Sequence, residues 1–301
     1  MARTRYAPDR GLTVRMVGTM FGLGVLYVIF AAVLLALGVS AVFVLVISAG
    51  MLFFQWWFSD SLAMRSMRAV VVTPEQAPQL HGLVDRLVAL ADMEKPRVAI
   101  ADTDVPNAFA TGRSHKRAVV VVTTGLLKRL DRDELEGVLA HELSHVAHRD
   151  VTVMTIASFA AIVAGVLART LMWGGLFRDR RDQNTALVFL VVLAVTAVVY
   201  VLSFLLTRAL SRYRELGADR GAALLTGRPT ALASALQKVT GEVARIPTKD
   251  LRAMEPVSAF AFAPALGAGR GVDLAHLFSS HPPLERRLEQ LAQISAQLGQ
   301  R

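Results

Sequence analysis

The stretch His141-Glu142-Leu143-Ser144-His145 carries the strongest signal for both fold and chemistry in this chain of 301 residues. On a helix, residues four apart share a face, so both imidazoles can reach one metal ion. Glu142 lies about 100° round the helix, where a carboxylate can take a proton from a metal-acidified water. Asp131 and Glu134 predict a capped helix start, and no helix breaker follows before Gly165. The alternative is a surface helix with two incidental histidines.

A catalytic zinc site needs a third protein ligand and one open position. His148 lies on the same face, but about 10.5 Å of helix rise separates it from His141, too far for one ion to bind both. Glu215 is the better candidate, because a hairpin of the two intervening apolar stretches would return it to the motif. Asp219, one turn further, could accept a hydrogen bond from a ligand histidine. A solvated helix face paired with neighbouring arginines is the alternative for these two carboxylates.

Composition is unusually apolar and basic. Hydrophobic residues make up 53%, charged residues only 19%, and the net charge is +9, with a mean hydropathy of +0.45. These values exclude a disordered or low-complexity chain. The absence of cysteine excludes a disulfide scaffold, Cys-ligated zinc, an iron–sulfur cluster and a cysteine nucleophile.

Four uncharged apolar stretches predict four transmembrane helices. No charged residue occurs between Arg15 and Asp60, which is enough chain for two spans broken at Gly38-Val39-Ser40. Two more uncharged stretches run from Val151 to Ala168 and from Gln183 to Thr207. A cleaved signal peptide fits the first stretch poorly, because the run is too long and continues into a second one. The expected spans are about 16–37, 40–59, 151–172 and 185–207.

The arginines near the span ends predict that both termini lie in the cytoplasm. Those on the expected inner side are Arg3, Arg5, Arg10, Arg15, Arg65, Arg68, Arg132, Arg149, Arg208, Arg212, Arg214 and Arg220; those on the outer side are Arg169, Arg178, Arg180 and Arg181. The basic balance therefore reflects orientation. No nucleic-acid partner is expected, because no stretch interleaves Lys or Arg with aromatic residues.

The polar blocks 60–150 and 208–301 are expected to pack as the two halves of one catalytic domain. They flank the second hairpin, 151–207, and follow an N-terminal tail and first hairpin, 1–59. Within them, a helix is predicted from Thr73-Pro74-Glu75-Gln76 to about Met93. Strands are predicted at 97–101 and 118–123. An amphipathic helix follows Pro282-Pro283, and the Ala/Gly/Phe-rich stretch 258–271 is expected to be a loop.

Four blocks in this order resemble HtpX-type membrane zinc metalloproteases, relatives of the CAAX prenyl protease. They are Asn107-Ala108-Phe109-Ala110-Thr111-Gly112, the HELSH motif at 141–145, Ser211–Asp219, and Ser280-His281-Pro282-Pro283. The resemblance implies a mainly α, multi-pass membrane protein with a zincin-like (gluzincin) catalytic domain and a small β-sheet. It also implies Glu215 as the third ligand, with Glu142, Asp219 and His281 around the reaction centre. The departures are the Ala/Gly-rich stretch before His281 and the Arg-rich loop at 178–181.

The resulting hypothesis is peptide-bond hydrolysis on one Zn²⁺ per chain, held by His141, His145 and Glu215. Glu142 is the expected base and then acid, and His281 either stabilises the oxyanion or caps the last helix. Substrate is expected to add as a strand along 118–123, or else this is a plain core strand. The expected substrate-binding residues are Asn107, Ala108, Phe109, Val120 and Val121.

The resemblance further implies quality control of misfolded membrane proteins in the bacterial cytoplasmic membrane. The expected partners are then polypeptide substrates and the lipid bilayer. CAAX-type processing of prenylated peptides and a non-catalytic, zinc-stabilised membrane scaffold are the alternatives. Glu142 favours an enzyme over the scaffold, since a structural metal site has no use for a base beside its ligands.

Overall fold

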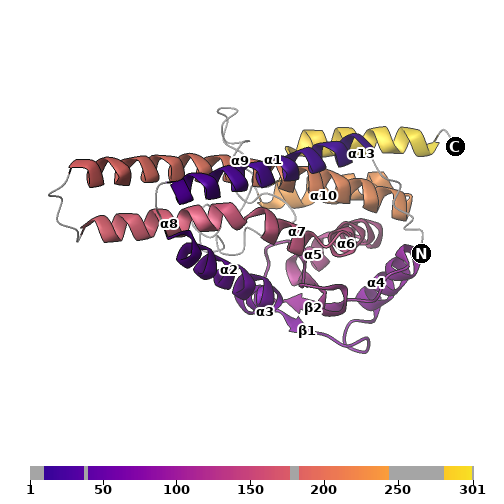
Figure 1. Cartoon of the computed structure of the whole chain (residues 1–301). Helices are drawn as coiled ribbons and strands as arrows, with labels where there is room; N and C mark the ends of the chain where they lie inside the picture. The colour runs from indigo at the N-terminus through magenta and orange to yellow at the C-terminus, as the bar shows by residue number, and fades with distance from the viewer. Residues whose placement is uncertain (1–9, 37–39, 177–182, 244–280, 300–301) are drawn as a thin grey trace.

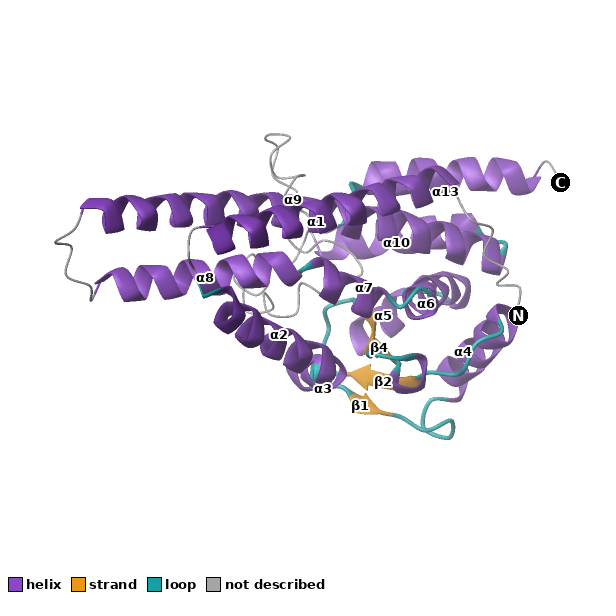
Figure 2. Cartoon of the chain, in the orientation of Figure 1, coloured by secondary structure: helices purple, strands orange, loops and turns teal. Residues whose placement is uncertain are grey.

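The computed structural model describes residues 10–36, 40–176, 183–243 and 281–299 (Figure 1). Long apolar helices extend to one side of the molecule, and a small sheet with shorter helices forms the other end (Figure 2). The long helices are α1 (Arg10–Ala36), α2 (Ala41–Trp57), α8 (Phe159–Leu176) and α9 (Gln183–Thr226). Helix α9 packs against both α1 and α8, and its far end belongs to the sheet-bearing part.

Large apolar side chains lie exposed along these helices, as expected of surfaces that contact lipid. Examples on α1, α2 and α9 are Val17, Phe21, Val28, Val46, Phe54, Leu187, Leu190 and Val198. By length and composition, Arg10–Ala36 and Phe189–Thr226 could each cross a membrane. A third span arises if Asp150–Ala157 and Ala161–Arg169, bent by 43°, are taken as one.

The described helices thus support two spans, or up to three, where the sequence predicts four. Helix α2 is the predicted span that is too short to count among them. Its 17 residues give about 25 Å of helix, less than the roughly 30 Å of a bilayer's hydrocarbon core. The predicted break at Gly38-Val39 and the Arg-rich loop at 178–181 lie outside the described residues, as does the stretch 258–271.

A four-stranded mixed sheet has the order β1-β2-β4-β3. Its strands are β1 (Val70–Val71), β2 (Arg97–Ala101), β3 (Ala108–Thr111) and β4 (Val119–Thr123). The parallel pair β2 and β4 confirms the two predicted strands, and β1 and β3 join them antiparallel on either side. The two outer strands were not predicted, because β1 has only two residues and β3 has four without a β-branched run.

The core beneath the sheet joins chain segments on both sides of the second hairpin. Helix α4 (Pro78–Ala91), strand β4 and helix α6 (Arg132–Ala147) come from the first segment. Helices α10 (Pro229–Val243) and α13 (Leu284–Gly299) come from the second. Their shared buried side chains include Leu83, Leu87, Val120, Leu139, Leu143, Leu232, Leu236 and Leu291. Three short helices complete the fold: α3 (Ser59–Ser66), the 3₁₀ turn η1 (His115–Arg117) and α5 (Thr124–Arg129).

Helix α4 begins at Pro78, later than the sequence predicts. The predicted bond from the Thr73 N–H to the Gln76 side chain forms at 2.9 Å, but it closes a turn before the helix. Pro78 disfavours the helical conformation at the residue before it. Ala77 accordingly adopts φ −139° and ψ 63°, and the helix starts at the proline.

Helix α6 starts as predicted and ends sooner. Its capping box is complete: Asp131 accepts from the Glu134 N–H, and Glu134 accepts from the Asp131 N–H. The expectation of one helix that has no break before Gly165 and runs into the third predicted span is wrong. Arg149 adopts a left-handed conformation with φ 55°, so the chain turns and starts α7 (Asp150–Ala157) before α8. The sequence also predicts that the fourth apolar stretch continues past Arg208 as a helix to about Leu225, and α9 does so, ending at Thr226.

Candidate active site

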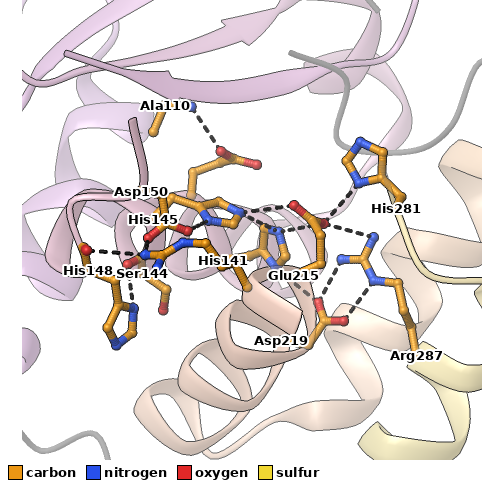
Figure 3. A network of polar contacts seen from close by, with 12 residues as sticks. Ala110, His141, Ser144, His145, His148, Asp150, Glu215, Asp219, His281 and Arg287 are labelled. Carbon is orange, nitrogen blue, oxygen red and sulfur yellow. Dashed lines mark hydrogen bonds and ion pairs between the residues drawn. The ribbon is translucent and has the colours of Figure 1, made fainter. Parts of the chain in front are cut away.

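Three candidate ligands from two helices meet at one point (Figure 3). The Nε2 atoms of His141 and His145 on α6 lie 3.1 Å apart. Glu215 on α9 places one carboxylate oxygen 3.6 Å from His141 Nε2 and the other 3.4 Å from His145 Nε2. These residues form the group, among those the structure describes, that could hold a metal ion.

The spacing of these atoms fits a tetrahedral zinc ion. Metal–ligand bonds of about 2.1 Å separate neighbouring ligand atoms by roughly 3.3 Å. The two nitrogens lie 3.1 Å apart, and they lie 3.6 and 3.4 Å from different oxygens of Glu215. One ligand atom from each of the three residues lies within 4.8 Å of the other two. The set has two imidazole nitrogens and one carboxylate oxygen, which is the donor set of a catalytic zinc site with three protein ligands.

A carboxylate stands behind each histidine. His141 Nδ1 lies 2.9 Å from Asp219 Oδ1, and His145 Nδ1 lies 2.6 Å from Asp150 Oδ2. With Nδ1–H directed at a carboxylate, each ring turns the lone pair of Nε2 towards the other ring and Glu215. Three electron-rich atoms converge there, so the arrangement favours a cation between them.

The pKa values of the two histidines agree with a site that attracts positive charge. Burial lowers the pKa of His141, but hydrogen bonds to Asp219 and Glu215 outweigh it and raise the pKa above its ordinary value. Burial likewise lowers the pKa of His145, while its hydrogen bond to Glu215 and the nearby carboxylates raise it overall.

Two buried arginines pair with the carboxylates behind the histidines. Arg287 on α13 is 2% exposed and donates to both oxygens of Asp219, at 2.6 and 2.7 Å. Arg214 on α9 forms an ion pair with Asp150. The partners of Asp219 are thus His141 and Arg287, a residue from the last described helix, rather than arginines of its own helix.

Glu142 lies beside the metal-ligand group and is 4% exposed. Its carboxylate accepts a hydrogen bond of 2.9 Å from the backbone N–H of Ala110 on β3. Burial raises the pKa of Glu142 above the ordinary glutamate value. A raised pKa suits a group that must both accept and return a proton near neutral pH.

His281 also reaches this site, whereas His148 does not. His281 precedes α13, and its Nδ1 lies 3.0 Å from Glu215 Oε2, as Figure 3 shows. His148 sits at the C-terminal end of α6, where its Nδ1 lies 2.8 Å from the Ser144 carbonyl oxygen. The helix-rise argument against His148 as a ligand agrees with this placement.

The expectation that substrate adds along 118–123 is wrong about the strand. Strand β4 is hydrogen-bonded to β2 on one side and β3 on the other, so neither edge can accept another strand. Val120 and Val121 are fully buried core residues. Strand β3 is the edge of the sheet, and the Ala110 N–H that meets Glu142 shows that this edge faces the site.

Among the other predicted substrate-binding residues, Ala108 and Phe109 belong to β3, and Asn107 directly precedes it. The Asn107 carbonyl accepts from the Thr123 N–H of β4. Alternation along the strand therefore points the backbone polar groups of Phe109 towards β4 and those of Ala108 and Ala110 towards the free edge. All three predicted side chains are buried.

Sequence reasoning missed Asp150, Arg214, Arg287 and the Ala110 backbone. The sequence held one hint of the role of Asp150, because it is an acidic residue about one helical turn after the histidine pair. In the expected continuous helix, however, its side chain would point away from His145. Arg287 offered none, because nothing in its sequence neighbourhood distinguishes it from the adjacent Arg286.

Comparison with known proteins identifies a peptidase family and close relatives over nearly the whole chain. Residues 74–295 match peptidase family M48. The chain is 59% identical over 298 residues to Protease HtpX homolog 1 of Streptomyces coelicolor, covering 99% of this chain and 97% of that protein. It is 51% identical over 300 residues to a Protease HtpX homolog of Moorella thermoacetica, covering 99% of each.

A solved structure shares the fold. The crystal structure of S. mikatae Ste24p superposes with a TM-score of 0.55 at 17% sequence identity, covering 94% of this chain and 67% of that chain. At this identity the similarity concerns the fold alone. It supports the arrangement in which long helices extend to one side of a part that carries a small mixed sheet.

Proposed function

Because the chain belongs to peptidase family M48 and is a membrane metalloprotease, we propose that it is a zinc-dependent endopeptidase of the bacterial cytoplasmic membrane. Its proposed substrates are misfolded or damaged membrane proteins, cleaved on the cytoplasmic side. One observation carries the zinc assignment: ligand atoms of His141, His145 and Glu215 lie within 4.8 Å of one another, with Glu142 beside them.

Those three residues would hold one Zn²⁺ per chain, with Asp219 behind His141. A bound zinc ion supplies Lewis acidity, which acidifies water and polarises the scissile carbonyl group. Glu142 takes the proton from the attacking water and later gives it to the leaving amine. The Ala110 N–H holds the carboxylate in place. His281, which reaches the same site, donates a hydrogen bond to the oxyanion.

The substrate backbone adds to the free edge of β3. Ala108 presents its backbone groups there and Ala110 its carbonyl group, while Asn107 and Phe109 anchor the strand to the sheet. Strand addition binds a substrate through hydrogen bonds to its main chain rather than through contacts with particular side chains. Such a site accepts unfolded segments of many sequences, which suits a quality-control protease.

The site lies close to the predicted membrane surface. From Thr207, the last residue of the fourth predicted span, α9 continues unbroken to Glu215, a rise of about 12 Å. We propose four spans, with α2 completing the first hairpin of segment 1–59 and α8 and α9 the second, 151–207. Segments 60–150 and 208–301 then form the catalytic domain, with both termini in the cytoplasm.

Two other functions are less well supported. A non-catalytic scaffold has no use for Glu142, a buried carboxylate beside the ligands. Processing of prenylated peptides is favoured by no feature of the described residues, and the similarity to Ste24p is one of fold alone.

The test is cleavage by the purified protein in detergent, before and after zinc removal. Chelation should abolish cleavage of an unfolded membrane protein, and added Zn²⁺ should restore it. A prenylated peptide offered in parallel should be cleaved much more slowly. Cleavage that survives complete zinc removal would contradict the proposal, and preference for the prenylated peptide would redirect it to the CAAX-type alternative.

A further inference from the structure

Asp150 and Arg214 form a buried ion pair that none of the proposed chemical steps uses. Asp150 is 9% exposed and Arg214 is 7% exposed. One oxygen of Asp150 lies 2.6 Å from His145 Nδ1, and the other pairs with the Arg214 guanidinium. The charges therefore form a chain, from guanidinium to carboxylate to the imidazole of a candidate ligand.

The backbone is shaped to make this chain possible. Helix α6 ends after the histidine pair, and Arg149 takes a left-handed conformation. That conformation is unfavourable for an L-residue, and here it starts α7 so that Asp150 meets His145. Arg214 also donates to the His148 carbonyl at 3.1 Å, which ties α9 to the end of α6.

Arg214 is joined to the metal-ligand group in a second way, because it directly precedes Glu215 on α9. One turn of α9 thus supplies the candidate ligand Glu215 and also Arg214, which orients Asp150 behind His145. On the opposite side of the group, Arg287 and Asp219 stand in the same relation to His141. The two histidines are held by matching pairs from different elements.

We propose that Asp150 and Arg214 are positioning residues that fix the His145 imidazole with Nε2 directed at the metal. This rests on the proposed zinc site. Neither residue touches the substrate, so both act through His145. An imidazole without such a partner can rotate or carry its proton on Nε2, and either change removes a ligand.

The test measures metal binding rather than turnover. Zinc affinity is determined by competition with a chelator, and the Co²⁺-substituted protein is examined by visible absorption. Asp150→Asn is the sharpest variant, because the amide cannot serve both neighbours. Both neighbours, the Arg214 guanidinium and the Nδ1–H of His145, are hydrogen-bond donors. An asparagine has one acceptor oxygen, so in either orientation of the amide its NH₂ group faces one of these donors.

Asp150→Asn and Arg214→Met should each weaken zinc binding by about 10–100-fold and shift the Co²⁺ absorption bands. Arg214→Lys keeps the charge and should recover part of the affinity. The matched control is Arg228→Met, which breaks an exposed Arg–Asp pair with Asp133; its zinc affinity and Co²⁺ spectrum should match those of the wild type.

Wild-type affinity and an unchanged spectrum in folded Asp150→Asn would overturn this inference while leaving the zinc site intact. Should that variant fail to fold, Arg214→Lys decides in the same way, with reduced affinity supporting the inference and wild-type affinity opposing it. A wild-type protein that binds no zinc would overturn the proposed function itself, and this inference with it.

Discussion

Each histidine of the candidate metal site has a carboxylate at its Nδ1 atom, and each of these carboxylates is paired with an arginine. His141 has Asp219 and Arg287, and His145 has Asp150 and Arg214. Because both Nδ1 atoms are occupied in this way, the two Nε2 atoms can only face Glu215. The identity of the third ligand is therefore a question that single substitutions can settle.

Replacing Glu215 tests that assignment. Glu215→Gln removes the one anionic residue among the three proposed ligands, and we expect zinc affinity to fall by about 100-fold or more. Substituting a residue that only hydrogen-bonds to a ligand typically lowers the affinity by about 10–100-fold. Chelator competition measures it. The matched control is Glu285→Gln, an exposed glutamate on α13, which should bind zinc as the wild type does. Unchanged affinity for Glu215→Gln, with loss for His148→Ala, would return the assignment to His148.

At the scale of elements, helix α6, which carries the candidate site's histidine pair, depends on its capped start and its packing. Its capping box fixes where the first turn lies, and its buried face packs on α4, α10 and β3. Gly137 marks the contact with α10, because a Cβ added there would lie 3.2 Å from the Leu232 backbone. The spacing between the two helices is set by this glycine.

A side chain at Gly137 should force the helices apart. Gly137→Val is expected to lower the free energy of unfolding by about 1–3 kcal/mol, the usual cost of overpacking a core. Thermal unfolding in detergent measures the change. Gly82→Ala is the control, since no atom lies within 4 Å of its added Cβ; it should stabilise helix α4 by about 0.5–1 kcal/mol. A Gly137→Val protein as stable as the wild type would contradict the packing argument.

The N-cap of α6 gives a second test of the same element. Asp131→Ala removes the side chain that accepts from the Glu134 N–H, and the expected loss is about 1 kcal/mol. Asp131→Asn keeps an acceptor at this position and should lose much less. Equal unfolding midpoints for Asp131→Ala and the wild type would show that the cap contributes nothing.

Local patterns predicted the elements that rest on local chemistry. The capped start of α6 and the β-branched run of β4 are marked by neighbouring residues in the sequence, and both agree with the structure. The break at Arg149 was not predictable, because an arginine has no preference for the left-handed conformation; tertiary contacts of Asp150 and Arg214 stabilise it. Strand β3 was missed for a similar reason, since its pairing with β4 rather than its composition makes it a strand.

At the scale of the whole molecule, the apolar surplus of the sequence lies in long helices that leave large side chains exposed. The core of the sheet-bearing part joins chain segments from before and after the second hairpin. Hydropathy alone located the long helices α1 and α9 but overestimated α2, which ends at Trp57 just before the separate helix α3. The site itself arises only when α6, α9 and α13 come together, which no single stretch of sequence encodes.

Orientation is testable with reporters. The arginine distribution predicts that a reporter fused after Arg301 behaves as cytoplasmic, and that one inserted after Arg181 behaves as external. Enzymatic reporters active on only one side of the membrane distinguish the two. An external signal at Arg301 would contradict the proposed orientation and the cytoplasmic placement of the site.

The most direct test of the central claim combines zinc content and cleavage in one pair of proteins, the wild type and Glu142→Gln. Glu142 is the proposed proton carrier and not a ligand, so both proteins should contain one zinc per chain. Only the wild type should cleave an unfolded membrane protein, with the variant slower by at least about 100-fold. A zinc-loaded Glu142→Gln protein that cleaves at the wild-type rate would contradict the account.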